Sequence, residues 1–357
     1  MRSPAGLDFL TRENAKHFLE SKQLKGQGQI APPNDINPIR RKFKMPFNGK
    51  SGKFNAAIRT VEIGTGDKAV KLGGECVSPL YSFDAPIENA PKVGVLITDY
   101  GFENEAEGIK AYYEGCANWG EIAQRAAAME GADFLVLKFD KADPNGDNAP
   151  VEDCVAIINE VAAATDMPLV IAGCKNAEKD AEIFNKAAEA LQGKNVLIFS
   201  AKEENYKGVA ASAVLAYGQK VGAESSVDIN LAKQLNVLIS QVGVDMGNIV
   251  MNVGTATAGY GFEYVVSTLD RVKAAALGQN DAQLQMPIIT SVGDETWGVK
   301  ESTASEADIP AWGPVDARGV NMEVTTAMAV LASGSNAVIL KHPTSVATVS
   351  KLIKELM

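Results

Sequence analysis

The sequence predicts an α/β protein built as a (β/α)8 barrel, the TIM-barrel arrangement, with an N-terminal hairpin and a basic N-terminal extension. Eight short apolar or β-branched runs recur between Val93 and the C-terminus. Helical patterns lie between them, so the period of the apolar residues switches from 2 to 3.6 and back. The runs begin about 35 residues apart, which suits right-handed βαβ units around a buried parallel sheet. Eight such units close most naturally into a barrel.

An open, doubly wound sheet is the main alternative architecture. Such a sheet binds ligands at a topological switch point, where the strand order reverses. The order of runs in this chain contains no signal for a switch point. The barrel is therefore the expected fold.

The first 50 residues differ in charge from the rest of the chain. They carry ten Lys or Arg and four Asp or Glu, whereas the whole chain has a formal net charge of -10. The segment 32–47 combines prolines with basic residues, which favours an extended arm over a packed helix. We divide the chain into an extension at 1–50 and a barrel domain at 51–357, and we favour a disordered, solvated extension over a docking arm.

The barrel domain is expected to begin with a hairpin at 54–74. Two β-prone runs are joined there by a Gly-Thr-Gly-Asp turn at 64–67. The eight β/α units follow from about residue 93. Their strands are expected to begin at Val93, Ala132, Pro168, Val196, Ser225, Ile249, Pro287 and Asn336. The clearest helical patterns begin at Asn118, Val151, Ala177 and Leu231.

Composition argues against several classes of protein. No run approaches 18 apolar residues and the N-terminus is mixed and charged, so we expect no membrane span, no signal peptide and a cytoplasmic location. The net negative charge argues against nucleic-acid binding. A metal site made by this chain alone is not expected, because there are two histidines and no closely spaced pair among the cysteines, which are Cys76, Cys116, Cys154 and Cys174.

In a barrel of this kind, the residues that follow each strand gather at one mouth, where function is expected. The glycine-rich stretch MNVGTATAGYGFEY at 251–264 follows the sixth expected strand. It lacks both the Lys-Ser/Thr ending of a phosphate-binding P-loop and the G-x-G-x-x-G fingerprint, so a nucleotide is not the expected ligand. The candidate binding residues at the mouth are Asp99, Tyr100, Asp140, Cys174, Asn205, Asp228, Asn230, Asn252, Gly254, Gly259, Trp297 and His342.

Lysines at strand ends could form Schiff bases, and an Asp beside a Lys could transfer protons. For Lys138 we favour an ion pair, because Asp140 follows two residues later. For His342 a structural or ligand-neighbouring role is favoured over catalysis. Trp297 could cover apolar surface, or it could face a flat ligand or a partner protein. We assign no catalytic residue.

Seven motifs follow the expected strands in order along the barrel. They are LKFDKADPNG (137–146), AGCKNAEKD (172–180), SAKEENYK (200–207), VDINLAKQLN (227–236), GYGFEY (259–264), SVGDETWGVKES (291–302) and LKHP (340–343). Together they resemble the delta, or small, subunit of the corrinoid iron–sulfur protein of the CO dehydrogenase/acetyl-CoA synthase system. The resemblance runs in order from about residue 45 to the C-terminus, and residues 1–44 look like an added extension.

The resemblance implies a barrel related to folate-dependent methyltransferases and paired with a large (gamma) corrinoid iron–sulfur subunit. That subunit would supply the [4Fe-4S] cluster and hold cobalamin against the mouth of this barrel, so this chain would contain no cluster. The implied cobalt accepts a methyl group from methyltetrahydrofolate through a methyltransferase and delivers it to acetyl-CoA synthase/CO dehydrogenase in the reductive acetyl-CoA (Wood–Ljungdahl) pathway. The glycine loop would then allow close approach of corrin side chains or of a partner.

Three functions are consistent with the sequence. The first is a non-catalytic scaffold subunit that caps a corrinoid. The second is a stand-alone pterin-dependent methyltransferase that uses the polar strand ends, and the third is an aldolase-like barrel that uses Lys138 or Lys341. The motifs of the resembling family favour the first.

Overall fold

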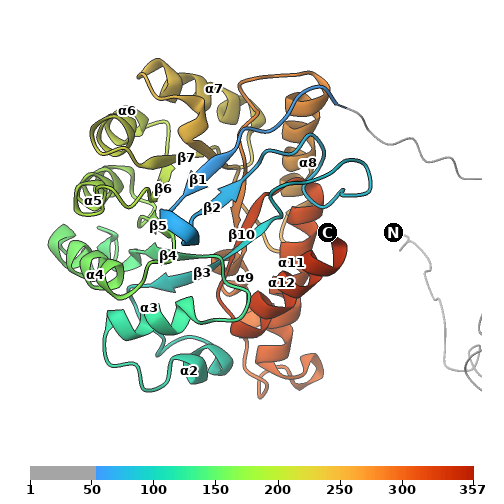
Figure 1. Ribbon diagram of the computed structural model, residues 1–357. Helices are drawn as coiled ribbons and strands as arrows, with labels where there is room; N and C mark the ends of the chain where they lie inside the picture. Colours follow the sequence, from blue (N-terminus) through green and yellow to red (C-terminus); the bar gives the residue numbers. More distant parts are fainter. Residues whose placement is uncertain (1–53) are drawn as a thin grey trace, which may run out of the picture. The chain divides into compact units, whose positions relative to one another are not determined.

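The computed structural model describes residues 54–357, which form a barrel of eight parallel strands surrounded by helices (Figure 1). Hydrogen-bonded strands follow the order β8-β7-β6-β5-β4-β3-β10-β9, and a parallel bridge between Met251 and Ile288 joins the two ends of this order. The predicted barrel is confirmed. Its strands are β3 (Lys92–Thr98), β4 (Phe134–Lys138), β5 (Leu169–Ala172), β6 (Leu197–Ala201), β7 (Lys220–Glu224), β8 (Ile249–Asn252), β9 (Ile289–Ser291) and β10 (Ala337–Leu340).

The helices form where apolar residues recur at the helical period. In α4, Cys154, Ile158 and Val161 form the buried stripe, and acidic residues occupy the first turn, where the helix dipole favours them. Within residues 54–357 no helix has the length and apolar character needed to cross a membrane. The helices are α2 (Glu107–Tyr113), α3 (Trp119–Ala127), α4 (Val151–Ala164), α5 (Ala177–Ala190), α6 (Tyr206–Val209), α7 (Ile229–Gln241), α8 (Phe262–Lys273), α9 (Val292–Thr296), α10 (Lys300–Thr303), α11 (Val315–Ser333) and α12 (Pro343–Leu356).

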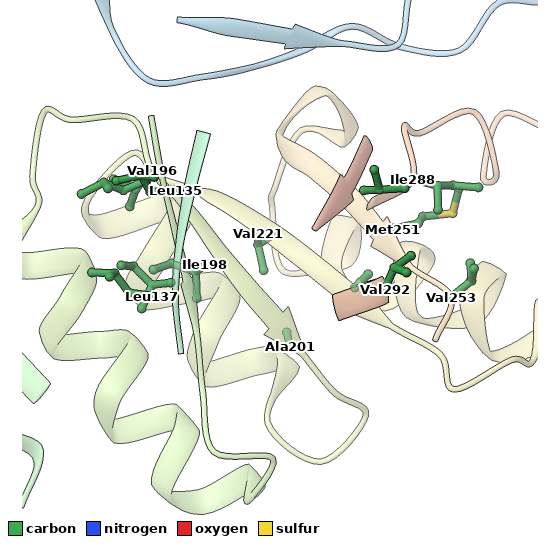
Figure 2. Packing of buried hydrophobic residues seen from close by; sticks show 14 of the residues in the cluster. Leu135, Leu137, Val196, Ile198, Ala201, Val221, Met251, Val253, Ile288 and Val292 are labelled. Carbon is green, nitrogen blue, oxygen red and sulfur yellow. The ribbon is translucent and has the colours of Figure 1, made fainter. Parts of the chain in front are cut away.

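Alternation along the strands divides the core into two layers. In β4, Phe134 and Val136 belong to the cluster inside the barrel, whereas Leu135 and Leu137 belong to the larger cluster between strands and helices. Figure 2 shows part of this outer layer, including Leu135, Leu137 and Ile198. Because Lys138 follows in the same alternation, its side chain lies on the inner side, above Val136.

The expected hairpin at 54–74 is present. Strands β1 (Val61–Ile63) and β2 (Val70–Leu72) pair antiparallel, and their apolar side chains join the cluster inside the barrel. Asn195, which precedes β6, donates from Nδ2 to the carbonyl oxygens of Glu62 and Gly64 at 2.9 Å. The hairpin therefore covers the amino ends of the strands, and the mouth at their carboxyl ends stays free for a ligand.

The fifth strand was predicted at 225–230, and this position is wrong. The fifth barrel strand is β7, and the chain has turned into α7 by Ile229. The side chain of Asp228 caps that helix by accepting hydrogen bonds from the backbone N–H groups of Asn230 and Leu231 at 2.7 and 3.2 Å. The sequence of β7 is KVGAE, whose glycine and charged ends hide its strand character. The strand-end acid is therefore Glu224, not Asp228.

The extension predicted at 1–50 lies outside the described residues, so its expected disorder stays a prediction.

Candidate functional site at the barrel mouth

A cavity of about 260 Å³ opens among the carboxyl ends of the strands. Its apolar lining comes from the innermost side chains Leu96, Val136, Phe199 and Ile339. Its polar wall combines carboxylates, amines, hydroxyls and one amide. The polar lining residues are Lys138, Lys175, Asp180, Ser200, Lys202, Glu224, Ser226, Asn252, Thr255, Ser291, Asp294 and Glu295.

Lys138 occupies the centre of an ion-pair cluster. Its Nζ lies 2.8 Å from both carboxylate oxygens of Asp294 and 2.8 Å from Oδ1 of Asp140. Burial alone would lower the pKa of Lys138, but the two carboxylates together raise it above the ordinary value. Burial would likewise raise the pKa of Asp294, but Lys138 and Lys175 hold it below the ordinary value. Lys138 therefore forms ion pairs with Asp140 and Asp294, and the ion pair expected for Lys138 is present.

A second cavity of about 330 Å³ lies beside the first and includes Tyr100 and Asp140 in its lining. Lys341 also lines it, and its Nζ is paired with Oε1 of Glu105 at 2.9 Å. Because Lys138 lines the first cavity and binds Asp140 of the second, its ion pairs lie at the boundary between the two.

A chain of hydrogen bonds crosses the ends of β6, β7 and β8. Ser200 Oγ donates to Oε2 of Glu224 at 2.7 Å and accepts from Nδ2 of Asn252 at 3.1 Å. Oδ1 of Asn252 accepts from the backbone N–H of Gly254 at 3.1 Å. Because the Gly254 N–H can only donate, it fixes which end of the Asn252 amide carries the oxygen.

Cys174 is buried and faces Asp180. The Asp180 side chain, 3% exposed, accepts at Oδ1 from the backbone N–H of Cys174 at 2.7 Å and from its Sγ at 3.2 Å. Burial raises the pKa of the Cys174 thiol to about 12, with the Asp180 carboxylate adding to the shift. The thiol therefore stays protonated at neutral pH, and it is no nucleophile.

Asp99 is buried at the end of β3. Both of its carboxylate oxygens accept from the backbone N–H of Lys141, at 3.1 and 3.2 Å. Burial raises the pKa of Asp99 to about 6, against the smaller opposing effect of that hydrogen bond. The neighbouring Tyr100 is exposed, and its ring lies 5.4 Å from Nζ of Lys141.

The loop after β8 contains the glycines that the sequence singled out. Gly254 has φ +84°, and a Cβ there would lie 3.1 to 3.3 Å from atoms of Ser226 and Val227. Ser226 and Val227 themselves have positive φ, an unfavourable conformation for a β-branched residue such as Val227. Gly259 also has a positive φ, but the space around its Cβ position is open. Ser226 and Val227 therefore form a strained pair beside the cavity, and functional sites often store such strain.

Several predicted binding residues lie away from the cavity. Asp228 and Asn230 begin α7, and Asn205 uses its amide to accept from Lys202 N and to donate to Ala177 O, at 2.8 and 2.9 Å. None of these three lines either mouth cavity. Of the other predicted residues, Asn252 and Gly254 line the first cavity, and Tyr100 and Asp140 line the second.

Trp297 and His342 pack against each other behind the mouth. Their rings are stacked with centroids 5.7 Å apart, and both side chains are buried. Nδ1 of His342 accepts from the backbone N–H of Thr344 at 3.1 Å and so caps α12. Trp297 lines a different cavity, of about 480 Å³, beside α2 and α11.

Sequence reasoning missed several cavity residues. Glu224 was missed because the fifth strand was placed too late. Ser200 and Lys202 could not be found from simple alternation, because Leu197 and Phe199 face the inside of the barrel and strict alternation would place Ser200 on the outer side. A register shift between Ile198 and Ala201 brings Ser200 to the cavity. In the described part of the chain, no three His, Cys, Asp or Glu side chains are grouped so that they could hold a metal ion.

Comparisons with known proteins match this fold and most of the chain. Residues 60–344 match a sequence model of the family described as CO dehydrogenase/acetyl-CoA synthase delta subunit. The acetyl-CoA decarbonylase/synthase complex subunit delta of Archaeoglobus fulgidus is 30% identical over 327 residues, which cover 89% of this chain and 72% of the relative. The subunit delta of Methanothermobacter thermautotrophicus is 31% identical over 313 residues, covering 87% and 77%.

A solved structure of Xanthomonas albilineans dihydropteroate synthase with 4-aminobenzoic acid aligns with a TM-score of 0.52 and 14% identity. The alignment covers 83% of this chain and 97% of that one. At this identity the likeness shows the barrel fold alone.

Proposed function

Because this chain belongs to the CO dehydrogenase/acetyl-CoA synthase delta-subunit family, we propose that it is the small, non-catalytic subunit of a corrinoid methyl carrier. In this proposal the barrel mouth caps a cobalamin held by a large corrinoid iron–sulfur subunit. The carrier takes a methyl group from methyltetrahydrofolate through a methyltransferase and passes it to acetyl-CoA synthase. The further partner is CO dehydrogenase, in the reductive acetyl-CoA pathway.

The observation that carries the proposal is that the reactive side chains at the mouth are already engaged. A lysine must lose its proton to form a Schiff base, yet Lys138 is held as an ammonium ion by two carboxylates and Lys341 is paired with Glu105. The Cys174 thiol is buried and donates from Sγ to Oδ1 of Asp180 at 3.2 Å, and burial raises its pKa. A mouth rich in polar groups, with its candidate nucleophiles engaged in this way, is suited to binding a ligand. The same contacts argue against an aldolase-like barrel.

The residues present fit a corrinoid in their chemistry. Cobalamin presents an apolar ring edged with neutral amide side chains, and the mouth offers apolar side chains beside hydrogen-bonding groups. When bound, the cobalt would supply the methyl-carrying chemistry. This chain would contribute shape, hydrogen bonds and exclusion of water. His342 is not placed to contact the ring from the cavity, because its Nδ1 caps α12 and the side chain is buried.

A pterin-dependent methyltransferase is the second candidate. The chain of Ser200, Glu224 and Asn252 could also pair with the cyclic amide of a pterin. If this candidate is correct, the purified chain alone should bind methyltetrahydrofolate and, when free cob(I)alamin is supplied as the acceptor, transfer the methyl group to its cobalt.

Co-purification tests the proposal. A tagged full-length chain should be expressed together with the large subunit in a corrinoid-supplemented host, and the eluate should be measured for visible absorption, cobalt and iron. We expect the large subunit and a corrinoid spectrum to co-elute, whereas the chain expressed alone should hold neither cobalt nor iron. Failure of the two subunits to associate, or cluster-level iron in the lone chain, would refute the proposal.

A further inference from the structure

The hydrogen-bond chain at the mouth leaves a specific set of groups free. Asn252 uses one N–H toward Ser200 and one lone pair of Oδ1 toward Gly254. An amide has two N–H groups and two oxygen lone pairs, so one of each remains. Glu224 uses Oε2 toward Ser200, and its Oε1 lies 4.0 Å from Nζ of Lys202, which is too far for a hydrogen bond. The wall therefore still offers both donors and acceptors.

The charges on this wall select against an ionic ligand. Glu224 would repel an anion and Lys202 would repel a cation, and the two are close enough to compensate each other. A neutral group that offers both an N–H donor and a carbonyl acceptor matches what Asn252 and Glu224 leave free. Such a group is an amide.

The surrounding backbone holds the wall in place. Val227 N donates to Val253 O at 2.7 Å, which joins the loop after β7 to the loop after β8. Ser226 and Val227 have positive φ, and a Cβ added at Gly254 would lie only 3.1 to 3.3 Å from their atoms, tighter than an ordinary contact. This strain has a cost, and it persists because the packed loops fix the conformation. It places the Gly254 N–H where it orients the Asn252 amide.

We infer that Ser200, Glu224 and Asn252 form a subsite for one neutral amide group. This inference rests on the proposed function, in which the amide is an acetamide or propionamide side chain of the corrin. The cavity of about 260 Å³ lies below the usual range of about 300–1,000 Å³ for small-molecule pockets, so it suits one side chain of the corrin and not the whole ring.

Two corrinoids that differ only in their side chains can test the subsite. The complex of the full-length chain with the large subunit should be loaded with dicyanocobinamide, which has amide side chains, or with heptamethyl dicyanocobyrinate, which has methyl esters. Retention of each is then measured by visible absorption after gel filtration. The variants are Asn252→Ala and Glu224→Gln, and Asn230→Ala is the matched control because Asn230 is exposed at the start of α7 and lines no mouth cavity.

We expect Asn252→Ala to weaken cobinamide retention about tenfold, the effect of one lost buried hydrogen bond, and to weaken ester retention less, because an ester keeps the carbonyl acceptor but has no N–H to donate. Glu224→Gln should act in the same direction, so that the test survives if one variant folds poorly. Asn230→Ala should change neither retention. Equal effects on both corrinoids, or no effect on cobinamide, would overturn the inference while leaving the proposed function intact.

A third arm identifies the source of the amide. Suppose that Asn252→Ala reduces tetrahydrofolate binding to background and leaves the retention of both corrinoids unchanged. The subsite then takes the cyclic amide of a pterin, and the corrin assignment is wrong. If the wild-type complex retains neither corrinoid and binds no tetrahydrofolate, the proposed function and the subsite both fail.

Discussion

Replacing Lys138 with Met should destabilise the barrel strongly at neutral pH. The change removes the only cation within 3 Å of Asp294 in the described structure and leaves two carboxylates facing each other. The side chains of Lys138 and Asp294 are 10% and 17% exposed. Removing one partner of a buried ion pair costs about 3–5 kcal/mol. Lys175 remains at 3.4 Å and compensates in part, so we expect a loss of about 2–4 kcal/mol in the free energy of unfolding.

The pH dependence follows from the direction of the Asp294 shift. In the wild type the pKa of Asp294 lies below its ordinary 3.8, so this carboxylate stabilises the fold at neutral pH, and that contribution is lost only as pH falls through the lowered value. In Lys138→Met the ammonium group that lowers the pKa of Asp294 is gone, so burial raises the pKa of Asp294. The ionised carboxylate then costs stability at pH 7, and protonation relieves that cost as pH falls toward 4.

Urea denaturation of both proteins at pH 7 and at pH 4.5 measures the effect. The matched control is Lys110→Met, which removes an exposed pair with Glu107 and should change stability by less than about 1 kcal/mol. The reasoning is refuted if Lys138→Met is as stable as Lys110→Met at pH 7. It is also refuted if the loss is as large at pH 4.5 as at pH 7.

Three further changes have defined outcomes. Because the pKa of Asp99 is raised to about 6, its ionised form costs stability above pH 6 and not below pH 4. Asp99→Asn should therefore stabilise the fold by up to about 3 kcal/mol at pH 8 and change stability little at pH 4. A loss of stability at pH 8 in urea denaturation would contradict this. Asp228→Ala should lower the free energy of unfolding by about 1 kcal/mol because α7 loses its cap, and Asp228→Ser should restore most of that loss. Corrinoid retention should not change, and reduced retention would place Asp228 in the site. Gly259→Ala should lower the free energy of unfolding by about 1–2 kcal/mol through its positive φ alone, and Gly254→Ala should lower it more because Val227 lies against that position. Equal losses in thermal unfolding would contradict the steric argument.

The strands with continuous apolar runs could be placed from sequence. The run that contains β4 reads FLVLK, with every residue buried, and the helix patterns at Val151 and Ala177 begin where α4 and α5 begin. The fifth strand could not be placed in this way. Gly222 is required where Phe199 and Ser200 lie against β7, and glycine weakens the strand pattern that sequence reasoning depends on.

The position of the site could be predicted from the sequence, but only some of the residues that form it could. Sequence shows that a residue follows a strand, yet the direction of its side chain depends on the alternation and on local capping. Asn252 faces the cavity, whereas His342, also just after a strand, turns back to cap α12. Trp297 is likewise directed into the layer behind the mouth, where Gly319 leaves room for its ring. Such choices are made by tertiary packing, which a single sequence does not display.

The rate of methyl transfer per bound cobalt tests the central claim most directly. The two-subunit complex with wild-type chain or with Asn252→Ala should be supplied with methyltetrahydrofolate and methyltransferase, and both the rate and the cobalt content should be measured. If this subunit caps the corrinoid without making bonds, cobalt occupancy should fall in the variant while the rate per bound cobalt stays the same. If Asn252→Ala abolishes transfer at full cobalt occupancy in an intact complex, the subunit is itself a catalyst and the proposed function is wrong.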